Sequence, residues 1–121
     1  MLRVLIVDDY KDSAKSMTML LGLSGYETEA AESGESALLA VGRNWPNAVL
    51  LDIGMPGMDG FEVARRIKEM AVGRAMPAFI AISGYHESAL SERFRDEGFC
   101  RCLLKPADRS ELVQILEGLP A

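Results

Sequence analysis

Three aspartates in this sequence stand directly after short apolar runs. Asp8 and Asp9 follow the run VLIV, and Asp52 follows the run AVLL. Carboxylates that lie close together make one another harder to ionise, so such a cluster holds either a proton or a cation. Oxygen ligands without histidine or thiolate suit a hard ion such as Mg²⁺. We therefore predict a Mg²⁺ site made of Asp8, Asp9 and Asp52, to which the backbone carbonyl of Gly54 adds a ligand.

Two further polar side chains end later apolar runs. Ser83 follows the run FIAI, and Lys105 follows the run CLL. A metal ion, an ammonium group and a hydroxyl around one carboxylate form a pocket for a tetrahedral anion with three exposed oxygens. Phosphoryl transfer depends mostly on such positioning and charge neutralisation. We therefore predict that Asp52 is a nucleophile that forms an acyl phosphate, with Lys105 and Ser83 beside it.

The elements that must position these residues follow from the alternation of apolar runs with amphipathic segments. Short continuous apolar runs are typical of strands buried on both faces of a parallel sheet. Apolar residues at helical spacing indicate helices between them. Four buried strands are predicted at Val4–Val7, Ala48–Leu51, Phe79–Ile82 and Cys102–Leu104, and an edge strand at Tyr26–Ala31. Helices are predicted over Ala14–Leu21, Ala37–Val41, Phe61–Met70, about Glu87–Glu97, and from an N-cap at Asp108 through Glu111 and Leu116.

This order of elements predicts an α/β fold, a flavodoxin-like (βα)5 doubly wound parallel sheet with strand order 2-1-3-4-5. In such sheets ligands bind at the carboxyl ends of the strands, between strands 1 and 3. The five polar residues described above all follow a predicted strand. We therefore expect the fold to gather them at one edge of the sheet.

Length and composition limit the other possibilities. The 121 residues suit one domain, 1–121, and 49% hydrophobic with 26% charged residues argues against disorder. The formal charge of −5, with no basic stripe, argues against direct nucleic-acid binding. No apolar run is long enough for a membrane span or a signal peptide, so we expect a cytoplasmic location without membrane contact. Cys100 and Cys102 are predicted to be free thiols, because neighbours two apart on a strand are badly placed for a disulfide.

The motifs together resemble the receiver domain of two-component response regulators. They are Asp8-Asp9, Asp52 followed by MPGMDG at 55–60, Ser83, and Lys105-Pro106, each at a predicted strand end. The resemblance covers essentially the whole chain. It implies that Asp52 is the phospho-acceptor, that Asp8 and Asp9 organise Mg²⁺, and that Ser83 and Lys105 contact the phosphoryl group. Pro106 would follow a cis peptide bond.

The resemblance also implies partners and a class of activity. The phosphoryl donor would be a phosphohistidine on a sensor histidine kinase or a histidine phosphotransfer protein, and a fused or downstream output domain would receive the signal. Such a domain is not an enzyme in the conventional sense, although it catalyses its own aspartate phosphorylation and dephosphorylation. Cys102 stands where receivers usually carry Tyr or Phe, three residues before the lysine. With Ser83-Gly84-Tyr85 and Gly98-Phe99, this resembles receivers of hybrid sensor kinases and phosphorelays.

Two alternatives remain beside this interpretation. Asp8 and Asp9 could merely cap the helix that follows them. The chain could also be a receiver-like adaptor that signals by protein docking without phosphorylation. An aspartyl phosphatase usually has a second acid two residues beyond its nucleophile, where this chain has Gly54.

Overall fold

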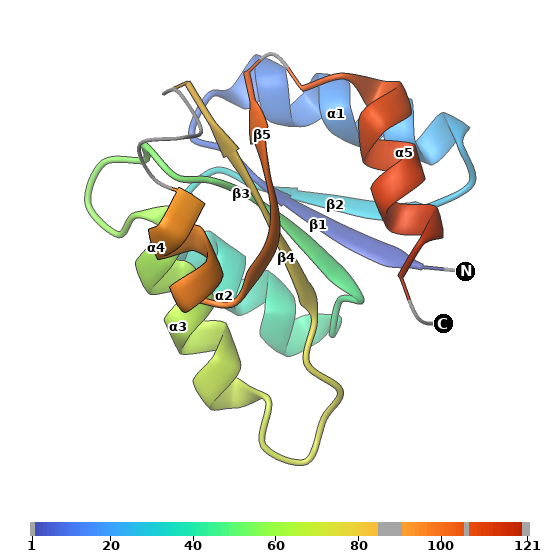
Figure 1. Cartoon of the computed structure of the whole chain (residues 1–121). Coiled ribbons are helices and arrows are strands. Elements are labelled where there is room, and N and C mark those ends of the chain that lie inside the picture. The colour runs from blue at the N-terminus through green and yellow to red at the C-terminus, as the bar shows by residue number, and fades with distance from the viewer. Residues whose placement is uncertain (1, 85–90, 106, 120–121) are drawn as a thin grey trace.

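A computed structural model of the chain describes residues 2–84, 91–105 and 107–119 (Figure 1). Five parallel strands form one sheet in the order β2-β1-β3-β4-β5, which is the predicted order. The strands are β1 (Arg3–Val7), β2 (Glu27–Ala31), β3 (Ala48–Asp52), β4 (Ala78–Ser83) and β5 (Phe99–Leu104). The helices are α1 (Lys11–Leu23), α2 (Gly34–Arg43), α3 (Gly60–Met70), α4 (Ser91–Asp96) and α5 (Arg109–Glu117).

The helices cover both faces of the sheet, so the central strands are buried on both sides. Helices α1 and α5 lie on one face, and α2, α3 and α4 lie on the other (Figure 1). Alternate residues of β1 contact different cores: Val4 and Ile6 pack towards α1 and α5, whereas Leu5 and Val7 pack towards α2 and α3. All five residues of β3 are buried. This double burial explains why the strands read as continuous apolar runs.

Strand β2 is an edge strand, as its more alternating sequence predicted, and it begins at Glu27. Its acidic side chains form ion pairs with neighbouring elements: Glu27 with Arg3 at 2.7 Å and Glu29 with Arg43 at 2.8 Å. Charged side chains on an edge strand discourage pairing with a further chain.

Helix ends differ from the predicted ones in detail. The predicted second helix ends before Gly42, but α2 continues through this exposed glycine to Arg43. Asp108 is the N-cap of α5, as predicted, and accepts a hydrogen bond from the Ser110 N–H at 2.9 Å. Helix α4 is described from Ser91, so its predicted start near Glu87 lies outside the described residues.

Strand β5 contains a register shift that the sequence did not reveal. Phe79 pairs with Phe99 but Ile80 pairs with Arg101, so Cys100 is the extra residue of a bulge. As a result Phe99 and Cys102 both pack on the core under α3 and α4. Neither Cys100, which is exposed, nor Cys102, which is half-buried, forms a disulfide within the described part of the chain, as predicted.

Candidate functional site

The carboxyl ends of the strands bring the predicted polar residues together. Asp8 directly follows β1, Asp52 is the last residue of β3, and Ser83 is the last residue of β4. Their exposed fractions are only 7%, 6% and 2%, respectively. Backbone hydrogen bonds continue the sheet past these ends: Ile53 N–H donates to Ile82 O at 3.1 Å, and Lys105 N–H donates to Ser83 O at 2.8 Å. The polar groups are therefore held on rigid backbone at one edge.

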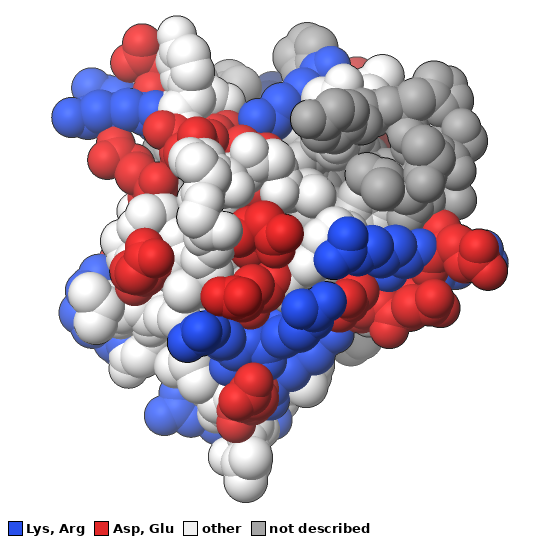
Figure 2. All heavy atoms as spheres, turned by 90° about the vertical axis from the view of Figure 1, so that its left-hand side faces the viewer, with Lys and Arg blue, Asp and Glu red and all other residues white. Residues whose placement is uncertain are grey.

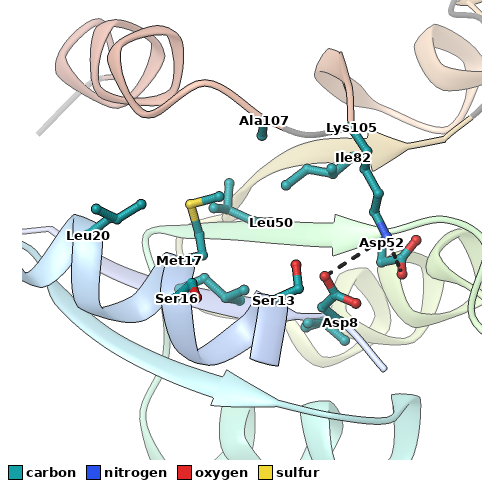
Figure 3. Close-up of a pocket in the computed structure, with 12 residues that line it drawn as sticks. Asp8, Ser13, Ser16, Met17, Leu20, Leu50, Asp52, Ile82, Lys105 and Ala107 are labelled. Atoms are coloured by element: carbon teal, nitrogen blue, oxygen red, sulfur yellow. Dashed lines mark hydrogen bonds and ion pairs between the residues drawn. The ribbon is translucent and has the colours of Figure 1, made fainter. Parts of the chain in front are cut away.

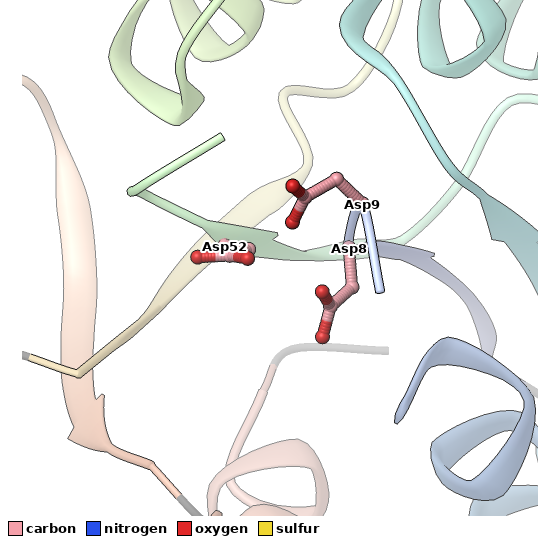
Figure 4. Close-up of side chains that lie close together, drawn as sticks. All are labelled: Asp8, Asp9 and Asp52. Atoms are coloured by element: carbon pink, nitrogen blue, oxygen red, sulfur yellow. The ribbon is translucent and has the colours of Figure 1, made fainter. Parts of the chain in front are cut away.

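Three carboxylates converge there (Figure 4). One oxygen each from Asp8, Asp9 and Asp52 lies within 4.8 Å of the other two, and Asp9 is the exposed member. A set of carboxylate oxygens open to solvent on one side fits a hard divalent cation that keeps several waters. The residues present therefore fit a receiver-type metal site.

Asp8 is fixed by the turn into α1. Its Oδ1 accepts a hydrogen bond from the Tyr10 N–H at 2.9 Å, and Tyr10, not an aspartate, is the N-cap of that helix. The capping alternative is therefore not confirmed: neither aspartate is the N-cap of α1, and Asp8 instead stabilises the turn that precedes this helix. Its second oxygen lies 3.9 Å from Lys105 Nζ and faces the site.

Lys105 is the cation of the site and reaches across it to two of the acids (Figure 3). Its Nζ donates to Asp52 Oδ2 at 2.9 Å. Burial alone would lower the pKa of Lys105, but the hydrogen bond and charge of Asp52, together with Asp8 and Asp9, raise it above its ordinary value. The ammonium group therefore stays charged at neutral pH beside the carboxylate of Asp52.

The loop after Asp52 folds back onto this residue. The Gly54 N–H donates to Asp52 Oδ1 at 3.1 Å, so both carboxylate oxygens of Asp52 accept a hydrogen bond. This hydrogen bond places the backbone of Gly54 beside the acids. Gly54 is also exposed, and its carbonyl stays a predicted ligand of the metal. The predicted cis peptide bond before Pro106 lies outside the described residues.

A cavity of about 490 Å³ adjoins the acids and was not predicted from the sequence. It has a charged end formed by Asp8, Asp52 and Lys105 and a largely apolar interior under α1 (Figure 3). The α1 residues that line it are Ser13, Ser16, Met17 and Leu20. Ser16, Met17 and Leu20 lie three, four and seven residues after Ser13, so all four share one face of the helix. This periodicity is the sequence signal from which the lining of the cavity could have been predicted.

The basic residues of α3 contact acidic or backbone groups of the same chain. Acidic and basic side chains are interspersed over the face shown in Figure 2. On α3, Arg65 pairs with Glu97 and Arg66 pairs with Glu62. Lys68 donates to the backbone oxygen of Glu97. These cations are therefore engaged within the chain.

Comparison with known proteins finds the same family over nearly the whole chain. Residues 4–117 match the family described as "Response regulator receiver domain". The chain is 34% identical over 119 residues to the response regulator MprA of a Mycobacterium species (strain KMS), covering 97% of this chain and 50% of that protein. It is 38% identical over 125 residues to the virulence sensor protein BvgS of Bordetella bronchiseptica, covering 99% of this chain and 10% of that protein. The chain thus spans half or less of these two relatives.

The fold is also similar to that of solved response regulator structures. The response regulator protein TrrA of Thermotoga maritima, crystallised in complex with Mg²⁺ and BeF, superimposes with a TM-score of 0.81 at 29% identity, covering 97% of both chains. Similarity to a sensor protein as well as to a response regulator agrees with the predicted resemblance to receivers of hybrid sensor kinases. From the fold, the strand-end acids and these matches, we conclude that the chain belongs to the response regulator receiver domain family.

Proposed function

We propose that residues 1–121 form one receiver domain in which Asp52 accepts a phosphoryl group from a phosphohistidine. The observation that carries this proposal is the arrangement around Asp52. Asp52 is only 6% exposed, and its carboxylate lies within 4.8 Å of two further carboxylates and is paired with an ammonium group at 2.9 Å. A nearly buried acid in such a setting has no packing role, whereas a phosphoryl acceptor needs a cation on each side.

The transfer is a displacement at phosphorus. A carboxylate oxygen of Asp52 donates an electron pair to the phosphorus atom while the bond from phosphorus to the histidine nitrogen breaks. The electron pair of the broken bond stays on the ring nitrogen, and a proton from solvent completes the neutral imidazole. The product on this chain is an acyl phosphate at Asp52.

The surrounding groups supply positioning and charge. Asp8, Asp9, Asp52 and the Gly54 carbonyl would hold Mg²⁺, which neutralises charge on the transferred group when it is bound. Lys105 would move its hydrogen bond from Asp52 to a phosphoryl oxygen, and the Ser83 hydroxyl would contact another phosphoryl oxygen. The distance of 2.9 Å between Lys105 Nζ and Asp52 Oδ2 supports this change of partner, because a small movement of the long lysine side chain would bring Nζ to a phosphoryl group on Asp52.

The donor is a sensor histidine kinase or a histidine phosphotransfer protein. Similarity to parts of both a sensor protein and a response regulator supports a place in a two-component or phosphorelay system. The phosphorylated domain then relays the group onward or acts on a fused or downstream output domain. The rival function is an adaptor that docks without phosphorylation.

Intact-mass spectrometry after incubation with phosphoramidate tests the proposal against that rival. We expect wild-type protein to gain one phosphoryl group only when Mg²⁺ is present, and Asp52→Asn to gain none. Far-UV circular dichroism of the variant controls for folding. Uptake by Asp52→Asn at the wild-type rate would overturn the assignment of Asp52, and no uptake by the wild type would favour the adaptor.

A further inference from the structure

The loop between Asp52 and α3 is held at one end by a backbone hydrogen bond and at the other by close packing of a glycine. At the Asp52 end, the Ile53 N–H donates to the Ile82 carbonyl at 3.1 Å. At the α3 end, Gly60 lies so close that a Cβ placed on it would be 2.9 Å from Asp52 O and 2.7 Å from Ile53 Cδ1. The loop therefore closes on the backbone of Asp52 itself.

The middle of the same loop rests on the first residue of α2. A Cβ placed on Gly34 would lie 2.7 Å from Met58 Sδ, 2.8 Å from Met58 Cβ and 2.9 Å from Met58 Cγ. Real Cβ atoms essentially never approach other atoms so closely. A new side-chain rotamer of Met58 could move its sulfur but not its Cβ, so its backbone would also have to shift.

Gly34 is itself fixed in place. The N-cap Ser33 exchanges hydrogen bonds with Ser36: Ser33 Oγ accepts from the Ser36 N–H and Ser36 Oγ accepts from the Ser33 N–H, each at 3.1 Å. This capping box sets where α2 begins. Because α2 is anchored, a side chain at position 34 would displace the loop rather than the helix.

We propose that Gly34 is a positioning residue for the metal site, acting through Met58 on the loop that carries Gly54. Its lack of a side chain lets Met58 pack on α2, and this contact sets the position of the backbone between Asp52 and α3. The inference rests on the proposed function, because it concerns the same Mg²⁺ and Asp52 site. The inference goes beyond the predicted ligands, because neither Gly34 nor Met58 is one of them.

Substitution Gly34→Ala should weaken Mg²⁺ binding by about tenfold, as loss of an outer support of a metal ligand does. The readout is a Mg²⁺ titration of labelled protein followed by amide chemical shifts. In the metal-free protein, hydrogen exchange of the Gly54 amide should become faster, because its bond to Asp52 Oδ1 depends on the loop position. At saturating Mg²⁺, phosphoryl uptake should recover most of its rate.

Gly42→Ala is the matched control, since it changes a glycine of the same helix whose added Cβ would meet nothing within 4 Å. It should leave Mg²⁺ affinity and Gly54 exchange unchanged. Met58→Gly removes the opposing Cβ, so Gly34→Ala introduced into that background should have no further effect. Met58→Gly alone should also speed Gly54 exchange, because it releases the loop from α2.

Three results would overturn the inference. They are a Gly34→Ala variant with wild-type Mg²⁺ affinity, an undiminished effect of Gly34→Ala in the Met58→Gly background, and a Met58→Gly variant with wild-type Gly54 exchange. The last measurement does not require Gly34→Ala to fold. Titration and exchange need no phosphorylation, so wild-type protein that binds Mg²⁺ but accepts no phosphoryl group contradicts the proposed function alone.

Discussion

Asp52 has both carboxylate oxygens engaged by the chain, one by the Gly54 N–H and the other by Lys105 Nζ. Lys105 also lies 3.9 Å from Asp8, so one ammonium group partly neutralises two nearly buried acids. A divalent cation bound by these acids would meet the repulsion of that ammonium group. Under the proposed function, the position of Lys105 would therefore influence both Mg²⁺ binding and the reactivity of Asp52.

Replacing Lys105 with methionine should therefore separate metal binding from chemistry. Without the competing cation, Mg²⁺ should bind more tightly by about 1 kcal/mol, or roughly fivefold. At saturating Mg²⁺, phosphoryl uptake should fall by about 100-fold, because a group that stabilises the developing charge is gone. A Mg²⁺ titration and timed intact-mass measurements check both effects, with exposed Lys15→Met as the control. Equal Mg²⁺ affinity in both variants would contradict the competition.

The raised pKa of Lys105 gives a pH-dependent contribution to stability. A group whose pKa is higher in the folded than in the unfolded chain stabilises the fold fully below its unfolded value, near 10.5, and less as the pH rises through its folded value. The free energy of unfolding lost in Lys105→Met should thus be constant from about pH 7 to about pH 9 and shrink towards about pH 11. Urea unfolding of both proteins measures it. A loss that grows with pH would contradict this account.

At the scale of elements, α3 connects the site to the rest of the molecule. It begins at Gly60 against Asp52 O, and its N-cap Asp59 accepts a hydrogen bond from the Glu62 N–H at 2.9 Å. Helix α3 also contacts α4 and the residue that follows it. Phe61 stacks on Phe94 with ring centroids 5.3 Å apart, and Arg65 pairs with Glu97. The hydrogen bond from Arg65 holds the pKa of Glu97 below its usual value.

Removal of the α3 cap should have a measurable but moderate cost. Asp59→Ala leaves an amide of the first turn without its partner, and the free energy of unfolding should fall by about 1 kcal/mol. Asp59→Ser should retain most of the stability, because a hydroxyl can accept the same hydrogen bond. Chemical denaturation measures both variants. Equal losses in the two variants would show that the negative charge, rather than the cap, matters at this position.

The contacts of Phe94 and Glu97 with α3 should limit how far a conformational change that starts at Asp52 extends into α4. Cys102, at the position where the resemblance implies an aromatic residue, packs on the same core cluster as Phe94 and Phe99. We therefore expect phosphorylation to change amide chemical shifts in the loops around Asp52 and Lys105 more than in residues 92–97. Spectra with and without phosphoramidate and Mg²⁺ test this. Large shifts confined to α4 and β5 would contradict it.

For the whole molecule, the sheet is what made the site predictable. Parallel strands place their carboxyl ends at one edge, so the sequence positions of Asp8, Asp52 and Ser83 alone placed them together. The bulge at Cys100 was not predictable, because it depends on which residues of β4 and β5 pair. The packing of Met58 on Gly34 joins residues from separate elements, and no local pattern encodes such a contact.

The charge of the chain gives no support to nucleic-acid binding. Acidic and basic side chains are interspersed on the face in Figure 2, and the formal charge is −5. Among the described residues, no helix combines the length and apolar character needed to cross a bilayer.

The most direct test of that site is to locate the phosphoryl group chemically. Borohydride reduces an aspartyl phosphate to homoserine but leaves free aspartate unchanged, so peptide mass spectrometry can identify the modified residue. After treatment with phosphoramidate and Mg²⁺, followed by borohydride, we predict homoserine at position 52 and unchanged aspartate at positions 8, 9 and 59. Homoserine at any of those three positions, with Asp52 unchanged, would contradict the central claim.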